Sequence, residues 1–194
     1  MAPDDERVLV ARLRAGDTGA FDEVYDAYRP RVFAFLLRMT RSRTVAEDLL
    51  DETWLRLVRH APRLLPDTRL GPWLFTVARN LYWSQRRDAL VEESSVAELL
   101  TLWPSSAPWP SPFDLTAAGE LERRVERALS TLSPQYREVV LLVGHEGLTP
   151  TEAAGMCGIS PEALRQRLSR ARAALAERLR ETPAVAAFKK GYAT

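Results

Sequence analysis

The sequence predicts an all-α protein of two small helical domains joined by a flexible linker, the second domain containing a helix-turn-helix. Apolar residues recur every three or four positions through residues 1–87 and 119–182, which is typical of amphipathic helices. Strand-like alternation is nowhere sustained. Between the two blocks, residues 88–118 contain four prolines interleaved with serines, a composition that cannot continue a helix and is typical of an extended linker.

Four helical segments are expected in the first domain, covering residues 4–15, a stretch that starts at Asp17 and includes Pro30, residues 44–60 and residues 72–87. Gly16 can end the first segment and Asp17 can cap the second. Pro30 either kinks that second helix or starts a new one, because proline lacks the N–H that a helix interior needs. Residues 61–71 are expected to form a loop. Residues 183–194 form a short tail.

The charge of the chain is unevenly distributed. The formal net charge of +1 alone would not suggest a nucleic-acid-binding protein. However, residues 1–87 carry 15 arginines against 12 acidic residues, and residues 119–194 carry 12 basic against nine acidic residues. The 88–118 linker carries five acidic residues and no lysine or arginine. Two mildly basic domains are therefore joined by an acidic strip, and this patterning matters more than the total.

Several classes of function find little support in the sequence. Cys157 is the single cysteine, so no intramolecular disulfide can form, and it is expected to be a small buried residue. No apolar run reaches the length of a transmembrane helix, so we expect a cytoplasmic protein without membrane insertion. His60 and His145 lack metal-ligand spacing, and no glycine-rich phosphate loop is present. We therefore expect no enzymatic activity, cofactor or metal.

Residues 149–160 carry the signals of a helix-turn-helix. Thr149 can cap a first helix, and Glu152, three residues later, completes a capping box. Gly158 stands where that helix must stop, because glycine enters the left-handed conformation without steric cost. Ser160 and Pro161 then suit the cap and first residue of a second helix. The second helix is the one that a helix-turn-helix protein places in the major groove of DNA.

This second helix is amphipathic and rich in arginine. Its expected buried stripe consists of Leu164, Leu168, Ala171, Leu175 and Leu179. The candidate DNA-binding residues on its other faces are Arg165, Gln166, Arg167, Arg170 and Arg172. Arginine and glutamine donate to phosphates and base edges, so the pattern favours DNA binding. The alternative is a solvated amphipathic helix in an ordinary bundle.

The 44–60 helix has a core face, for which the expected residues are Leu49, Leu50, Thr53, Trp54 and Leu57, and a candidate interaction face on another side. This face consists of Asp48, Asp51, Glu52, Leu55 and Arg59. An apolar Leu55 among charged residues suits a protein interface better than a solvated surface. The alternative is an acidic surface with one stray leucine.

The 72–87 helix is expected to point Trp73, Val77 and Leu81 inward, and it carries candidate nucleic-acid-binding residues away from this apolar stripe. They are Arg79, Asn80, Trp83, Arg86 and Arg87. Arginines can hold the phosphate backbone and an aromatic ring can stack on an unpaired base, which is what binding an opened strand requires. Tyr82 and Trp83 suit the core equally well, and Phe75 is expected to be a core residue.

Three stretches in this order resemble the extracytoplasmic-function group of bacterial sigma factors. Residues 46–54 (AEDLLDETW) resemble the family's polymerase clamp-binding motif, and residues 73–81 (WLFTVARNL) its promoter-melting helix. Residues 132–139 (LSPQYREV), together with the helix-turn-helix, resemble its second DNA-binding domain. The resemblance covers about residues 5–182.

The resemblance implies a partner for each candidate surface. The face of the 44–60 helix would bind the clamp of core RNA polymerase, and the second domain its flap. Arg63 and Arg69 would lie in a loop that captures a flipped base of the −10 promoter element, next to the 72–87 helix. Arg165, Gln166 and Arg170 would face the −35 element, whereas Arg167 and Arg172 suit phosphates equally well. An anti-sigma factor is also implied.

The role of the linker and the function of the whole chain each have an alternative interpretation. The acidic linker would lie in the polymerase cleft by the resemblance, or it is a passive spacer. The whole chain could instead be a stand-alone helix-turn-helix repressor or activator. Such a protein needs neither the face on the 44–60 helix nor the residues on the 72–87 helix. Co-purification with core polymerase distinguishes the two functions.

Overall fold

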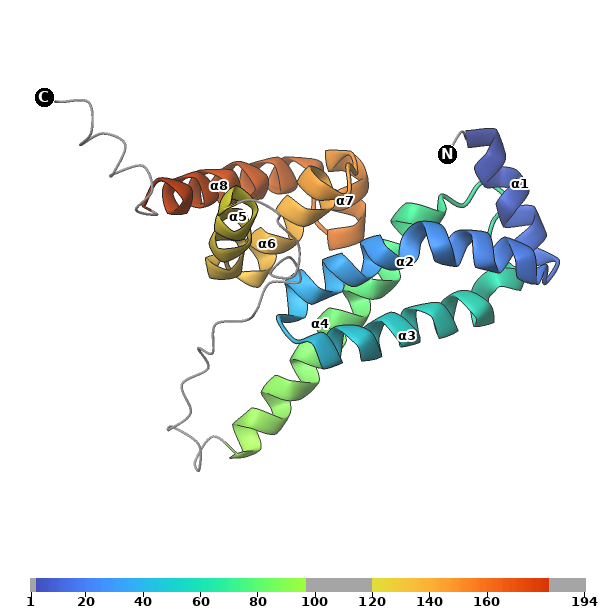
Figure 1. The fold of residues 1–194 in the computed structure, drawn as a ribbon, viewed down its shortest axis with the longest axis horizontal. Coiled ribbons are helices and arrows are strands. Elements are labelled where there is room, and N and C mark those ends of the chain that lie inside the picture. Colours follow the sequence, from blue (N-terminus) through green and yellow to red (C-terminus); the bar gives the residue numbers. More distant parts are fainter. Residues whose placement is uncertain (1–2, 97–119, 182–194) are drawn as a thin grey trace, which may run out of the picture. The chain divides into compact units, whose positions relative to one another are not determined.

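The computed structural model describes residues 3–96 and 120–181, and in these ranges all regular elements are helical, as predicted (Figure 1). The helices fall into two compact units. The first contains α1 (Pro3–Arg14), α2 (Thr18–Thr40), α3 (Arg43–His60), the short 3₁₀ helix η1 (Ala61–Arg63) and α4 (Leu70–Val96). The second contains α5 (Glu120–Thr131), α6 (Pro134–Val140), the π-helical turn η2 (Leu141–His145), α7 (Pro150–Cys157) and α8 (Pro161–Glu181).

In the first unit, α2, α3 and α4 pack against one another around a single core (Figure 1). The rings of Phe35 on α2 and Phe75 on α4 meet edge to face with centroids 5.5 Å apart. Both rings are buried, together with Leu36, Leu57 and Leu74. The prediction that Phe75 is a core residue is confirmed. This packing fixes which faces of α3 and α4 remain in solvent.

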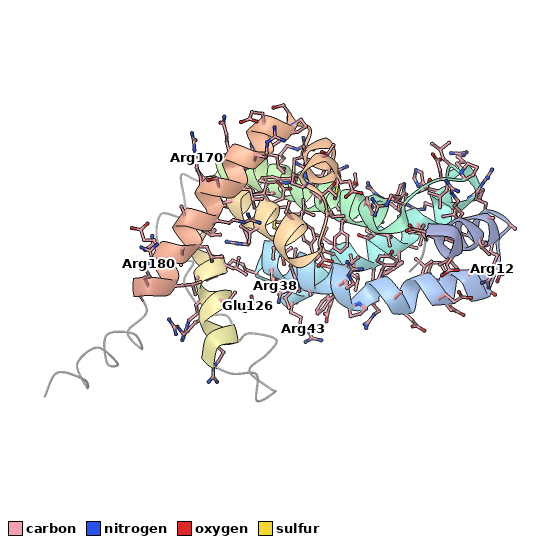
Figure 2. The ribbon with its side chains drawn as sticks, turned by 90° about the horizontal axis from the view of Figure 1, so that it is seen from above. Arg12, Arg38, Arg43, Glu126, Arg170 and Arg180 are labelled. Carbon is pink, nitrogen blue, oxygen red and sulfur yellow. The ribbon has the colours of Figure 1, made fainter. Side chains whose placement is uncertain are left out.

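Helix α1 is attached to α2 by charged side chains at the turn between them. The Asp17 carboxylate caps α2, accepting a 3.2 Å hydrogen bond from the Ala20 N–H, as predicted. Arg12 donates to Asp17 at 2.8 Å and to Glu23 at 2.7 Å, and it lies at this end of the unit (Figure 2). The Arg12 hydrogen bond is the main cause that lowers the pKa of Asp17. Gly16 adopts a φ of 78°, so the expected helix end is also confirmed.

Two helices extend further than the sequence predicts. Of the two alternatives for Pro30, a new helix starting there is wrong: α2 continues through it as one helix, with an exposed proline and buried residues on both sides. Helix α4 begins at Leu70, inside the expected 61–71 loop, because Pro72 then falls in the first turn, where no N–H is required. It also runs to Val96 rather than Arg87, since no proline or glycine interrupts residues 88–96.

The remainder of the predicted linker, from residue 97 to residue 118, lies outside the described residues, as does the 183–194 tail.

In the second unit, α8 packs against α5, α6 and α7. Leu164, Leu168 and Ala171 form its buried stripe, as predicted, whereas Leu175 and Leu179 are only half-buried. The stripe is therefore complete where α6 and α7 cover α8 and less complete toward its end.

A buried arginine connects the first two helices of this unit. Arg137 is only 4% exposed. Its guanidinium donates to the carbonyl oxygens of Leu129 at 3.0 Å, Ser130 at 2.9 Å and Leu132 at 2.9 Å. Carbonyls at the end of a helix have no partner within the helix, so Arg137 satisfies the end of α5 from α6.

Replacing Arg137 is expected to destabilise the second unit. The substitution Arg137→Met keeps the length of the side chain but leaves two buried carbonyls and one part-buried carbonyl without their donor, at a cost of about 3 kcal/mol. Urea denaturation followed by circular dichroism measures this loss. Arg127→Met, at an exposed position of α5, is the control and should change stability little. A similar loss in both variants would contradict the capping role of Arg137.

Candidate nucleic-acid interface

The predicted helix-turn-helix is formed by α7 and α8, with the predicted caps in place. Thr149 Oγ1 accepts from the Glu152 N–H at 3.2 Å, and Glu152 accepts from the Thr149 N–H at 2.8 Å, which completes the capping box. Gly158 ends α7 with a φ of 65°. Ser160 Oγ accepts from the Ala163 N–H at 3.1 Å and so caps α8. These local bonds determine where α8 starts and therefore which of its side chains face outward.

The recognition surface consists of the predicted DNA-binding residues of α8: Arg165, Gln166, Arg167, Arg170 and Arg172. Four of them are exposed and Arg167 is half-buried. Figure 2 shows Arg170 on this helix. The buried stripe of α8 packs against the rest of the unit, and the recognition surface on its other faces is left in solvent. This arrangement can donate hydrogen bonds to phosphates and to base edges.

Glu162, which was not among the predicted site residues, lies beside the recognition surface. Its carboxylate accepts from Arg165 Nη2 at 2.7 Å and from Gln166 Nε2 at 3.5 Å. The hydrogen bond from Arg165 is the main cause that lowers the pKa of Glu162. The spacing of three and four residues is the signal that could have revealed the pairing. In the free chain, the Glu162 carboxylate thus accepts hydrogen bonds from the donors of Arg165 and Gln166 that a nucleic acid would use.

The second predicted DNA-binding surface follows the loop before α4 and α4 itself. Its residues are Arg63, Arg69, Arg79, Asn80, Trp83, Arg86 and Arg87. Arg79 and Trp83 are half-buried and the others are exposed. Between Arg69 and Arg86 the helix rises by about 25 Å. These residues therefore form a track along α4 and not a single pocket.

The aromatic residues of α4 differ in their surroundings. Tyr82 is 4% exposed and belongs to the core, whereas Trp83 is half-buried. The two rings meet edge to face with centroids 5.2 Å apart. Trp73, expected to point inward, is half-buried and lies 6.1 Å from the ring of His60. Because Trp83 is only half-buried, part of its ring surface is available for contact with a base.

The predicted face of α3 lies in solvent. It consists of Asp48, Asp51, Glu52, Leu55 and Arg59. Leu55 is 50% exposed, and Val58, three residues later on the same side, is 55% exposed. Val58 was not among the predicted site residues, although its spacing from Leu55 could have revealed it. Glu52 accepts from Arg56 at 2.9 Å, so part of its charge is compensated within α3.

The residues behind this face form the predicted core of α3: Leu49, Leu50, Thr53, Trp54 and Leu57. All five are buried. Trp54 lies beneath Phe21 and Tyr25 of α2, with centroids 6.0 and 4.8 Å away. The face of α3 therefore lies over a packed core. The apolar pair of Leu55 and Val58 among charged residues is typical of a protein interface.

Other kinds of site are not found in the described parts of the chain. No cluster of three or more metal-ligating side chains occurs there. None of the helices in these parts is long and apolar enough to cross a membrane. Cys157, expected to be buried, is half-buried, and its thiol lies 3.7 Å from the buried carboxylate of Glu138.

Comparison with known proteins identifies the family. The model of Sigma-70 region 2 matches residues 24–89, and that of Sigma-70 region 4 matches residues 122–175. The RNA polymerase sigma factor CarQ of Myxococcus xanthus is 37% identical over 170 residues, covering 88% of this chain and 95% of CarQ. The ECF RNA polymerase sigma factor EcfG of Rhodopseudomonas palustris is 32% identical, covering 75% of this chain and 77% of EcfG. The chain belongs to the extracytoplasmic-function (ECF) sigma factors of RNA polymerase.

Solved structures agree with this assignment. The sigma factor RpoE of Bartonella quintana, crystallised with the anti-sigma factor NepR, is 28% identical and matches with a TM-score of 0.70. The match covers 84% of this chain and 98% of that sigma factor. The recognition surface lies within the region 4 match. The face of α3 and the α4 track lie within the region 2 match.

The turn of the helix-turn-helix offers a matched pair of glycine substitutions. Nothing lies within 4 Å of a Cβ added at Gly155 or Gly158, so packing is unaffected in either variant. Gly158→Ala should destabilise the unit by about 1 kcal/mol, because its φ is positive. Gly155→Ala, inside α7, should stabilise it by up to about 1 kcal/mol. Thermal melting measures both shifts, and shifts of the same sign would contradict the left-handed end of α7.

Proposed function

We propose that this chain binds core RNA polymerase, recognises the −10 and −35 elements of specific promoters, and initiates their transcription. Residues 1–87 would bind the clamp and open the −10 element, and residues 119–182 would bind the flap and the −35 element. Residues 88–118 would connect the two domains. One observation carries the proposal: a single chain contains both the recognition surface and the exposed apolar and acidic face of α3.

The face of α3 is the proposed contact with the polymerase clamp. Exposed Leu55 and Val58 provide an apolar centre, and the surrounding carboxylates would provide charge complementarity to a basic partner. A stand-alone helix-turn-helix repressor would have no use for this face, and no observation on the described residues favours that function.

The α4 track is the proposed contact with the opened −10 element. Its arginines would hold the phosphates of the single strand, and Trp83 would stack on a base. The loop before α4, with Arg63 and Arg69, would hold a base extruded from the duplex. Extrusion costs a few kcal/mol, which contacts in the loop must recover.

The recognition surface is the proposed contact with the −35 element. Arg165, Gln166 and Arg170 would contact base edges, whereas Arg167 and Arg172 would hold phosphates. On binding, Arg165 and Gln166 would give up their hydrogen bonds to Glu162 and donate to the DNA instead.

We further propose that the chain works in the cytoplasm, that it is not itself an enzyme, and that an anti-sigma factor controls it. Synthesis of RNA would be the work of the polymerase. Anti-sigma control is supported by the sigma factor of Bartonella quintana, which was crystallised with such a protein.

Run-off transcription with core polymerase on a genomic promoter library tests the function. The chain is expected to direct transcription from a defined set of promoters. Leu55→Asp should weaken binding to core polymerase about tenfold, because it places a charge at the centre of the interface. Val8→Asp is the control, since Val8 is also exposed (61%, against 50% for Leu55) but lies on α1. A chain that never joins core polymerase, or joins it without selecting promoters, would refute the proposal.

The choice of the −35 element is expected to depend on Arg165. Arg165→Ala should change which sequence of a −35 panel is transcribed best, since an arginine–guanine contact is worth about 1–3 kcal/mol of discrimination. Arg180→Ala, at an exposed position near the end of α8 (Figure 2), should leave the order unchanged. A uniform loss across the panel in Arg165→Ala would indicate a phosphate contact instead.

A further inference from the structure

The first turn of α4 is capped by side chains from other helices. The first N–H groups of a helix have no partner within it and need another acceptor. The Leu70 N–H donates to the Glu6 carboxylate of α1 at 2.8 Å. Pro72 has no N–H, and the Trp73 N–H donates to the Arg69 carbonyl at 3.0 Å. The Gly71 backbone hydrogen-bonds the phenol of a tyrosine on α2.

That tyrosine, Tyr28, is packed closely against the start of α4. A Cβ at Gly71 would lie 3.3 Å from Tyr28 Cε1 and 3.5 Å from its phenol oxygen, so glycine allows the approach. Burial raises the pKa of Tyr28, and the charge of Glu6 adds to this rise. The charges of Arg31 and Arg69, and a hydrogen bond with the Gly71 backbone, act in the opposite direction. Glu6, Tyr28 and the start of α4 therefore form one cluster.

Glu6 is held in place by the attachment of α1. It lies one turn before Val10, on the side of α1 that also carries Leu13, and both of these residues are buried. Arg12 joins the end of α1 to Asp17 and Glu23. Helix α1 also packs against η1, where the loop begins. The region 2 match starts at residue 24, so α1 lies outside it.

The loop that follows η1 is therefore held at both ends. At its beginning, η1 contacts α1 and Leu64 is buried. At its end, Leu70 is buried and its N–H is bound by Glu6. Between these two points lies the exposed segment that carries Arg69. A shift in the first turn of α4 would move this segment and the whole α4 track.

We propose that Glu6 and Tyr28 are positioning residues for recognition of the −10 element: by binding the first N–H groups of α4, they hold the preceding loop in the geometry that receives the opened strand. This inference rests on the proposed function. Neither side chain needs to touch DNA. They act on the loop and on α4.

The experiment compares promoter discrimination by polymerase holoenzymes that contain variants of the full chain. Two promoter libraries are transcribed, one randomised in the −10 element and one in the −35 element. Glu6→Ala should lower −10 discrimination about fivefold, the factor that corresponds to the ~1 kcal/mol lost with a helix cap, and leave −35 discrimination unchanged. Glu6→Gln keeps an oxygen that accepts from the Leu70 N–H, so it should restore most of the loss.

Two further variants complete the design. Asp5→Ala removes an exposed neighbouring carboxylate of α1 and should behave as the unsubstituted chain. Tyr28→Phe keeps the packed ring, removes only the phenol oxygen, and should lower −10 discrimination alone. It tests the inference even if Glu6→Ala does not fold.

The outcomes separate this inference from the proposed function. Discrimination in Glu6→Ala and Tyr28→Phe equal to that in Asp5→Ala would overturn the inference and leave the function intact. An equal loss of −10 and −35 discrimination, without restoration by Glu6→Gln, would show a role in stability only and would also overturn it. If the unsubstituted chain showed no −10 preference, the proposed function would fail and this inference with it.

Discussion

Backbone N–H groups at the starts of helices need acceptors, and this requirement determines the position of both proposed DNA-contacting surfaces. Ser160 caps α8 locally, whereas Glu6 reaches Leu70 at the start of α4 from another helix. A helix start displaced by one residue turns every following side chain by about 100°. Such a displacement would turn Arg165 away from its present direction. The caps therefore determine the function of residues that they do not touch.

The parts of the structure that the sequence could predict depend on signals close together in the chain. The capping box of Thr149 and Glu152 spans four positions, and Gly158 directly follows the short helix that this box begins. Asp17 caps α2 through a residue three positions later. Apolar spacing within a single helix likewise predicted the core of α3 and the first half of the stripe on α8. In these cases the partner is determined by helix geometry alone.

The parts that could not be predicted depend on how one helix meets another. The bond between Glu6 and Leu70 joins residues 64 positions apart, and no spacing rule connects them. The carbonyls that Arg137 binds belong to the preceding helix and its end. The π-helical turn after α6 also carries no simple sequence signal. For the site, the sequence predicted faces of helices. It could not predict that Arg63 and Arg69 adjoin a loop held by α1.

Arg137 and Arg165 differ in how deeply their side chains are buried, and spacing in the sequence does not reveal this difference. Arg137 is buried and donates to three carbonyls, so its removal would leave polar atoms without partners in an apolar interior. Arg165 is paired with Glu162, and their side chains are 59% and 65% exposed. Solvent screens such a pair, so the guanidinium can exchange the carboxylate for a phosphate or a guanine at little cost. The pairing therefore orients Arg165 without blocking it. An arginine that must leave its partner to bind DNA has to stand in solvent, and on α8 it does.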